Sequence, residues 1–300
     1  FDYNNPNHLA IDNPDTDLVV TDLKGYWAMS EGDGLVAYDS GSTLEEDVVQ
    51  NGDFSELGVE KVVNGDFATD SDWTKGDGWS ITNGVAVCDG TQTSSTSLNP
   101  NSIMSLTVGE TYKVTVNVNS TSSGFRLYDS IGVVDYSLDV GENVFYRTPS
   151  TSAYAVTSIA LVGSTGSISN ISVKQVDPND DWAFQIPNGQ TVEIENNQLH
   201  INYKTSETQG STSAYQTILS ATKTYKIEVD IASLTGIVRV QVGSIVNDFS
   251  TTGLKTFINT VNSGTLYIVR SSNSSNMECY INNISVTEIT PSAHGGIING

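Results

Sequence analysis

The sequence predicts an all-β fold of two antiparallel β-sandwiches in tandem. Ser, Thr, Asn and Gly dominate its polar residues, a mixture that suits strands and tight turns. Residues 111–118 and 224–231 alternate apolar and polar side chains, which is the period of a half-buried strand. No stretch has the pattern of an amphipathic helix of useful length. Each half has room for about eight short strands, and all-β domains of this size usually close as two packed sheets.

An internal repeat with one fixed spacing divides the chain. Tyr112 and Tyr225 lie in the matching segments Thr-Tyr-Lys-Val and Thr-Tyr-Lys-Ile, 113 residues apart. Asn170 and Asn283 open matching Asn-Ile-Ser-Val segments at the same spacing. Because two separated matches share one spacing, chance is a poor explanation. We therefore expect each pair to occupy equivalent strands.

The front of the repeat is looser but keeps the same order of features. Trp73 and Trp182 are each followed by a strand, an Asn-containing turn and a second strand, and we expect both tryptophans in the core. Asn83-Gly84 between alternating segments is a strong hairpin signal. We place the repeats at residues 61–177 and 178–290, with residues 44–60 as a linker or partial repeat.

The charge balance limits the classes of partner. The chain has 13 Lys+Arg against 35 Asp+Glu, a formal net charge of −22. Nucleic acid phosphates need Lys and Arg to replace their counterions, so a nucleic acid partner is not expected. Anionic membrane surfaces are disfavoured for the same reason. No stretch approaches the roughly 20 apolar residues of a membrane-spanning helix, so no membrane insertion is expected.

The two cysteines, Cys88 and Cys279, fall in different repeats. Two isolated cysteines are too few for a disulfide scaffold, and their spacing fits no zinc motif. We predict that they are buried small hydrophobes, with a disulfide as the less favoured alternative.

The first repeat contains a set of motifs in a fixed order: Val63-Asn64-Gly65-Asp66-Phe67, Trp73, Trp79, Gly109-Glu110-Thr111-Tyr112 and the closing segment 168–173. With these motifs the repeat resembles the carbohydrate-binding-module jelly roll, most closely the version found in virion structural proteins of tailed phages. The resemblance implies a jelly-roll fold for both repeats. The second repeat lacks the Asn-Gly-Asp-Phe opening, whereas a related opening at residues 49–54 looks like a partial duplication.

The flanks carry a different pattern, at residues 25–34, residues 37–41 and the His294-Gly295 segment that runs to Gly300. These segments resemble another family, the concanavalin-type, laminin-G-like lectin sandwich. The resemblance implies that both jelly rolls are inserted in a loop of a third, lectin-like β-sandwich. It assigns residues 22–43 to the start of that sandwich and residues 291–300 to the return into it, with residues 1–21 as a connector from a preceding domain.

The jelly-roll resemblance also implies a structural calcium ion where the first and last strands meet, held by carboxylate and carbonyl oxygens. The matching positions are Asp66 and Asn170. The sequence departs from the family at both ends of this site, because Ala68 stands where an acid is usual and Asn170 where an Asp is common. The alternative is that Asp66 only stabilises a turn. No other cofactor is expected.

Sugar binding would use aromatic faces and planar polar side chains on a sheet or in the end loops. For each tyrosine, ordinary strand packing is the competing interpretation. The candidate glycan-binding residues are Trp79, Tyr128, Tyr136 and Tyr154 in the first repeat, and Tyr203 and Tyr215 in the second.

Catalysis is not expected. The histidines are His8, His200 and His294, and none lies near a plausible nucleophile in sequence. Gly-x-Ser-x-Gly elbows and phosphate-binding loops are absent from the sequence. A pair of carboxylates for glycoside hydrolysis would arise here only by accident among the many acids.

The leading functional hypothesis is a non-enzymatic virion surface protein: a tail fibre, an appendage or a capsid decoration. Its expected partners are a host-surface glycan, other virion proteins and further copies of itself, at the virion surface. One alternative is a secreted bacterial adhesin or surface filament subunit, outside or on the cell. Another is the binding region of a polysaccharide-degrading enzyme.

Overall fold

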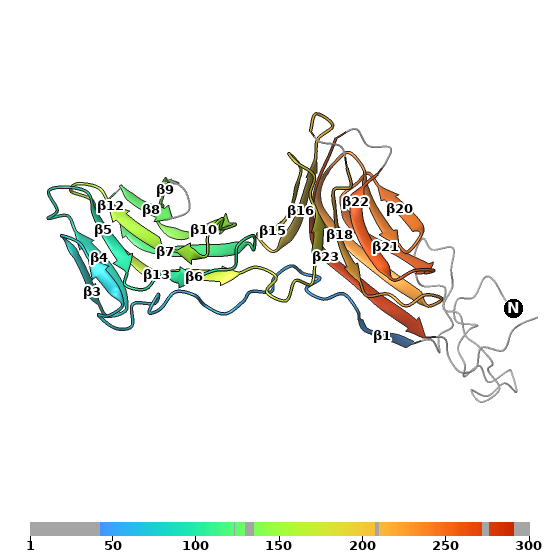
Figure 1. Ribbon diagram of the computed structural model, residues 1–300, viewed down its shortest axis with the longest axis horizontal. Coiled ribbons are helices and arrows are strands. Elements are labelled where there is room, and N and C mark those ends of the chain that lie inside the picture. Colours follow the sequence, from blue (N-terminus) through green and yellow to red (C-terminus); the bar gives the residue numbers. More distant parts are fainter. Residues whose placement is uncertain (1–42, 123, 130–134, 208–209, 272–275, 291–300) are drawn as a thin grey trace, which may run out of the picture. The chain divides into compact units, whose positions relative to one another are not determined.

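The structure is a computed structural model that describes residues 43–122, 124–129, 135–207, 210–271 and 276–290 (Figure 1). The predicted connector 1–21 and the lectin-like segments 22–43 and 291–300 lie outside the described residues, except for Thr43. Within the described residues all regular structure is β, as predicted. The same part of the chain contains no helix long and apolar enough to cross a membrane.

The first sandwich is formed within residues 54–181 by two five-stranded antiparallel sheets. One sheet has the order β10 (Gly141–Arg147), β7 (Tyr112–Thr121), β13 (Thr165–Gln175), β4 (Val85–Asp89), β3 (Trp79–Thr82). The other has the order β2 (Trp73–Lys75), β5 (Thr96–Pro100), β12 (Val156–Ala160), β8 (Phe125–Asp129), β9 (Asp135–Ser137). A short ladder joins β6 (Met104–Ser105) to β11 (Ala153–Tyr154).

The second sandwich has the same arrangement of strands. One sheet has the order β15 (Thr191–Glu195), β16 (Gln198–Tyr203), β23 (Met277–Thr290), β18 (Thr224–Thr235), β21 (Gly253–Thr260). The other has the order β14 (Ala183–Gln185), β17 (Ser213–Thr217), β22 (Thr265–Arg270), β19 (Val238–Val242), β20 (Ile245–Phe249). An additional strand, β1 (Thr43–Asp47), pairs with β23.

Both sandwiches show the strand order of a jelly roll. In the first, β4-β13-β7-β10 faces β5-β12-β8-β9, and in the second β16-β23-β18-β21 faces β17-β22-β19-β20. The predicted equivalences are confirmed. Tyr112 and Tyr225 lie on β7 and β18, and each hydroxyl accepts a 2.9 Å hydrogen bond from a backbone amide five residues upstream. Asn170 and Asn283 lie next to the same bulge in β13 and β23.

The two jelly rolls are nested in the chain rather than consecutive. Strand β1 pairs with the last strand of the second sandwich, with Leu44 opposite Ile289. The backbone N–H of Ile284 donates to the carbonyl oxygen of Gly52 at 2.9 Å. The indole N–H of Trp182 donates to the carbonyl oxygen of Asn51 at 3.1 Å. The opening of the second jelly roll is therefore at residues 43–53, before the first jelly roll, and not after it.

The opening of the first jelly roll uses the same contacts thirteen residues later in the sequence. The N–H of Ile171 donates to Gly65 O at 2.9 Å, and the indole N–H of Trp73 donates to Asn64 O at 2.9 Å. The structure thus differs from the predicted division into a linker at 44–60 and a second repeat at 178–290. The segment at 49–54 that resembled a partial duplication contains the Asn-Gly-Asp-Phe opening that the second repeat was thought to lack.

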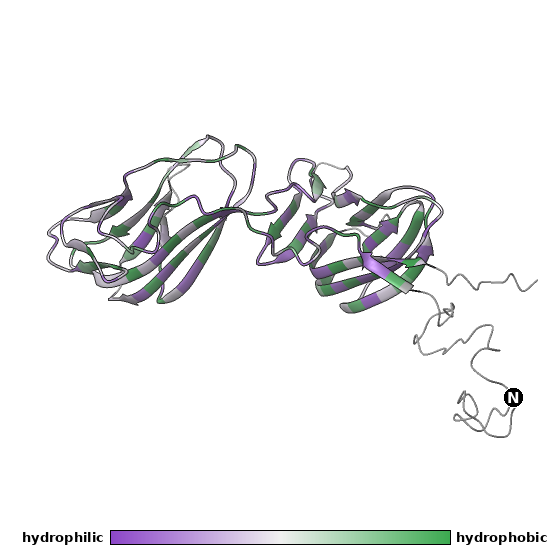
Figure 2. Ribbon diagram, turned by 90° about the horizontal axis from the view of Figure 1, so that it is seen from below, coloured by the Kyte–Doolittle hydropathy of each residue, from purple (hydrophilic) through white to green (hydrophobic). Residues whose placement is uncertain are grey.

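The cores follow the alternation seen in the sequence: hydrophobic and hydrophilic residues alternate along many strands (Figure 2), and in β7 and β18 buried residues alternate with half-buried ones. Trp73 and Trp182 are buried, as predicted. Cys88 and Cys279 are both free and buried, which confirms the prediction of small core hydrophobes. Burial raises the pKa of the Cys279 thiol to about 12, so this thiol stays protonated and unreactive at neutral pH.

Candidate glycan-binding faces

Three of the aromatic residues predicted to bind glycans belong to the core instead. Trp79, Tyr154 and Tyr203 are buried. The ring centroids of Trp79 and Phe125 are 5.4 Å apart. Arg270 lies over the Tyr203 ring, with its Cζ 4.2 Å from the ring centroid. Their ring faces contact protein, so they cannot stack on a sugar. The sequence pattern marks them as strand aromatics but does not determine which face of the sheet each one occupies.

Tyr136 lies at the margin of the first core. It is half-buried on β9, its ring centroid lies 4.1 Å from that of Phe145, and its hydroxyl accepts a 3.3 Å hydrogen bond from Arg147. This ring is partly occupied by protein contacts and is the weaker of the remaining candidates.

The outer face of the β14-β17-β22-β19-β20 sheet carries a pair of tyrosines. Tyr215 on β17 lies directly opposite Tyr267 on β22, and both are half-buried. Their ring centroids are 5.2 Å apart with an interplanar angle of 33°. Gln241 on β19 is the next residue along the same row, opposite Tyr267. The row therefore places two aromatic rings beside an amide, which are the two kinds of group that recognise sugars.

A fixed ion pair borders this row. Arg239 lies two residues before Gln241 on β19, and its guanidinium donates two hydrogen bonds, of 2.7 and 2.9 Å, to Asp248 on β20. The Ser271 hydroxyl donates to the same carboxylate at 2.6 Å. Hydrogen bonding from Arg239, then from Ser271, lowers the pKa of Asp248. Planar polar groups beside the tyrosine pair are thus held in place by each other.

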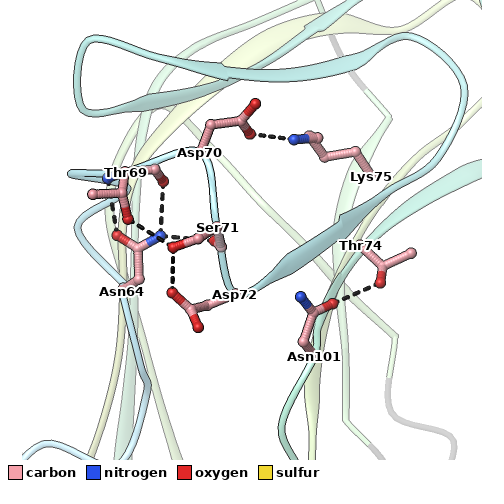
Figure 3. Close-up of polar contacts among 8 residues, drawn as sticks. All are labelled: Asn64, Thr69, Asp70, Ser71, Asp72, Thr74, Lys75 and Asn101. Carbon is pink, nitrogen blue, oxygen red and sulfur yellow. Dashed lines mark hydrogen bonds and ion pairs between the residues drawn. The ribbon is translucent and has the colours of Figure 1, made fainter.

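The equivalent face of the first sandwich is polar rather than aromatic. Tyr128 on β8 lies opposite Thr157 on β12, and the Thr157 hydroxyl donates to the side-chain oxygen of Asn99 at 3.0 Å. Thr74 on β2 lies opposite Asn99 and donates to the side-chain oxygen of Asn101 at 2.7 Å (Figure 3). One half-buried tyrosine, one amide and two hydroxyls follow one row across the sheet, and the Asn101 amide bonds to its last member, Thr74. This row includes the predicted candidate Tyr128.

A small cavity of about 170 Å³ lies at the end of that row. Its wall includes Asp72, Trp73, Pro100 and Ser102, which flank Thr74 and Asn101 in sequence. Beside it, the Asn64 side chain holds the loop through hydrogen bonds to the carbonyl oxygens of Thr69 and Ser71, each 2.8 Å long (Figure 3). The loop next to the cavity is therefore fixed by side-chain to backbone bonds.

The calcium prediction falls where the structure brings the first and last strands together, because Gly65 bonds to Ile171. The Asp66 carboxylate accepts a 3.3 Å hydrogen bond from the N–H of Ala68, as the turn interpretation requires. Asn170 is half-buried on β13, opposite Asn117. These contacts show the role of Asp66 in the turn, and a calcium ion at this place stays a prediction.

An acidic cluster not foreseen from the sequence lies where the inserted jelly roll begins and ends. Carboxylate oxygens of Glu56, Asp177 and Asp181 lie within 4.8 Å of one another. Burial, a hydrogen bond with Asp181, and the charges of Asp181 and Asp177 raise the pKa of Glu56. Similarly, burial and the nearby Asp180 raise the pKa of Glu110. Ionisation of these carboxyl groups therefore lowers the stability of the folded state.

Glu56→Gln is expected to stabilise the first sandwich at neutral pH. Folding raises the pKa of Glu56, so the protonated carboxyl favours the folded state and this contribution is lost as pH rises through the folded pKa. At pH 7 the ionised carboxylate therefore lowers the free energy of unfolding, and the neutral Gln removes that cost. We expect a gain of about 0.2–1 kcal/mol at pH 7 that shrinks towards pH 4.5. Thermal unfolding of the variant and the wild type at both pH values measures it, with exposed Glu46→Gln as control. An equal gain at both pH values would contradict the repulsion argument.

Sequence reasoning missed Tyr267 and Gln241, although both alternate with buried residues on β22 and β19. The alternation shows that each residue faces outward, but the pairing that aligns them with Tyr215 depends on strand order. Strand order is a long-range property that no local pattern contains.

No family model matches the sequence, and no curated protein matches it. Among solved structures, the chain is similar to the CBM22 tandem domain from Paenibacillus barcinonensis, at 10% identity over 78% of this chain and 98% of that one, with a TM-score of 0.25. It is also similar to an allantoicase, at 12% identity over 81% and 93%, with a TM-score of 0.26. An M60 catalytic domain with two CBM51 domains from Clostridium perfringens matches at 7% identity over 85% and 44%, with a TM-score of 0.21.

Proposed function

We propose that this chain is a non-enzymatic surface protein that binds glycans through the outer sheet faces of its two jelly rolls. The observation that carries the proposal is the row Tyr215, Tyr267 and Gln241 in the second sandwich. Half-buried rings are held rigidly by the sheet, so little freedom is lost when a sugar stacks on them. Gln241 offers both a donor and an acceptor to sugar hydroxyls.

The first sandwich supplies a second, more polar face, with Tyr128 and the Asn99 amide in one row and the Asn101 amide at its end. The two faces differ in chemistry, so we expect them to prefer different parts of a glycan. Two linked sites of modest affinity can raise overall avidity by roughly 10² to 10⁴ when both engage.

The resemblance of the repeats to tailed-phage virion modules supports a place on the virion surface, where many copies act together. Weak individual contacts then suffice for attachment to a host-surface glycan. The net charge of −22 keeps free chains apart. Assembly with other copies and other virion proteins would therefore use neutral surfaces or a separate anchoring domain.

The proposal includes no catalytic step. The one histidine among the described residues, His200, has both ring nitrogens facing glutamate oxygens at 3.2 Å. Such a pairing orients or charges the imidazole but does not place it on a hydroxyl nucleophile.

The test is binding of the whole chain to a panel of bacterial surface polysaccharides by glycan array and calorimetry. The double variant Tyr215→Ala and Tyr267→Ala is expected to weaken binding at least tenfold, since two stacked rings together contribute about 1.4 kcal/mol or more. The matched variant with Phe at both positions keeps the rings and is expected to retain binding.

If the alanine variant binds as tightly as the wild type, the row of Tyr215, Tyr267 and Gln241 is not the binding site. The double variant Tyr128→Ala and Asn99→Ala then tests the row of the first sandwich. Absence of binding to every glycan in the panel would overturn the proposal in favour of a spacer.

A further inference from the structure

A second group of polar side chains lies on the other sheet of the second sandwich, on strands β15, β16 and β23. The two strands β15 and β16 are joined by Asn196-Asn197, both with positive φ, of 53° and 56°, as a two-residue hairpin turn requires. Ligand atoms of Glu193, Glu195 and His200 lie within 4.8 Å of one another. Three side chains that can bind a metal therefore converge on one hairpin.

The imidazole of His200 is held in one orientation. The residue is only 8% exposed, and its ring stacks on Tyr280 with centroids 4.1 Å apart and an interplanar angle of 6°. Its Nε2 lies 3.2 Å from Glu278 Oε1. The same oxygen accepts a 2.9 Å hydrogen bond from the Asn202 side chain, which fixes the carboxylate. The ring can neither tilt nor turn without losing these contacts.

Two carboxylates face the two ring nitrogens of His200. Nδ1 lies 3.2 Å from Glu193 Oε1, and Nε2 lies at the same distance from Glu278 Oε1. The Nδ1 side of the ring therefore combines an imidazole nitrogen with the carboxylates of Glu193 and Glu195, a mixed nitrogen and oxygen donor set that suits a transition-metal cation.

We propose that the second sandwich binds one Zn²⁺ ion through Nδ1 of His200 and the carboxylates of Glu193 and Glu195. Zinc takes nitrogen and carboxylate ligands together, and three protein ligands leave a fourth position for water. Glu278 acts as a positioning residue, because a carboxylate on the second ring nitrogen of a metal-binding histidine fixes its tautomer and strengthens it as a ligand. Calcium and magnesium, which prefer oxygen ligands, gain nothing from the imidazole.

The first sandwich provides an internal comparison. On its equivalent strands, Val87 of β4 lies opposite Ser80 of β3 and Ser167 of β13, in the place of His200 opposite Tyr280. Thr82 ends β3 as Glu195 ends β15. The metal-binding side chains are thus particular to the second repeat and do not follow from the fold.

The test is calorimetric titration of the metal-free whole chain with Zn²⁺, supported by the visible spectrum of the Co²⁺ form. We expect one ion per chain. The Co²⁺ form is expected to show the visible absorption of a four-coordinate site, with three protein ligands and one water. His200→Ala is expected to abolish the binding, and the pair Glu193→Gln and Glu195→Gln to do the same. Glu278→Gln keeps the shape of the side chain and is expected to weaken binding by about 10- to 100-fold.

Controls separate this site from the other histidines and from loss of folding. A variant with His8→Ala and His294→Ala is expected to keep full Zn²⁺ affinity, as is Ser80→Ala in the first sandwich. Circular dichroism of each variant without metal verifies that it is folded. Undiminished Zn²⁺ affinity in folded His200→Ala would overturn the proposal. Equal affinity for Ca²⁺, lost only in the Glu variants, would also overturn it, by showing an oxygen-only site.

Discussion

A fragment of residues 178–290 is expected to remain unfolded, whereas residues 43–54 joined by a short Gly-Ser linker to residues 181–290 are expected to fold. The fragment contains most of the second repeat but lacks β1, which pairs with β23. It also leaves the Trp182 indole N–H and the N–H of Ile284 without the Asn51 and Gly52 carbonyl oxygens. Each buried donor left without a partner costs about 1–3 kcal/mol, a large part of a domain's stability.

The linker can be short because the ends of the inserted jelly roll meet. Leu57 pairs with Val176, and the N–H of Asp177 donates to Glu56 O at 3.2 Å. An inserted domain is tolerated when its ends lie close together, and its removal should then be tolerated as well. Residues 55–181 alone serve as the control and are expected to fold. Circular dichroism and thermal unfolding measure all three proteins, and a cooperative transition in the 178–290 fragment would show that the opening segment is dispensable.

The nested order shows what the repeat in the sequence could and could not predict. The spacing of 113 residues between Tyr112 and Tyr225 identified equivalent strands correctly, because strand alternation is a local property. It could not reveal that the front of the second repeat is displaced, since Trp182 stands 109 residues after Trp73 while Asn51 stands before Asn64. A search for repeats assumes that all segments of one copy follow one another in the chain. The folded sheet only requires that β1 lie beside β23, whatever the chain forms in between.

The candidate site was predictable to a lesser degree. The predicted candidates Tyr128 and Tyr215 lie half-buried on strands β8 and β17. Trp79, Tyr154 and Tyr203 have the same local pattern and are buried. Which side of a sheet becomes the core is decided by packing against the second sheet, so aromatic alternation alone cannot separate a binding ring from a core ring.

For His200, the alternation with Leu199 and Ile201 on a strand predicts a surface strand position. Alternation with Leu199 and Ile201 does place the ring on the outer face of β16, but the ring is buried there by the stacked Tyr280. Glu193 and Glu278, which face its two nitrogens, are 7 and 78 residues away in the chain. The contact with Glu193 can be predicted from the hairpin, whereas the contact with Glu278 depends on the position of β23 in the sheet.

Gly52→Ala and Gly65→Ala are expected to be among the most damaging single substitutions in the chain. A Cβ at Gly52 would lie 2.3 Å from the carbonyl oxygen of Ile284, and one at Gly65 would lie 2.1 Å from that of Ile171. Both obstacles are backbone atoms of a central strand, so no rotamer change relieves the contact. The same carbonyls of Gly52 and Gly65 accept hydrogen bonds from Ile284 and Ile171, and a shift of the turn would break them.

We expect each substitution to destabilise its own sandwich by about 2–4 kcal/mol and to leave the unfolding of the other largely unchanged. Asp53→Ala and Asp66→Ala are matched controls in the same turns, with an expected cost below about 1 kcal/mol, since Asp66 makes one long hydrogen bond to the Ala68 N–H. Denaturant unfolding followed by tryptophan fluorescence measures the four variants, because Trp73 and Trp182 each bond to the turn that is changed. If Gly52→Ala destabilised the first sandwich instead of the second, residues 43–53 would not be the opening of the second jelly roll.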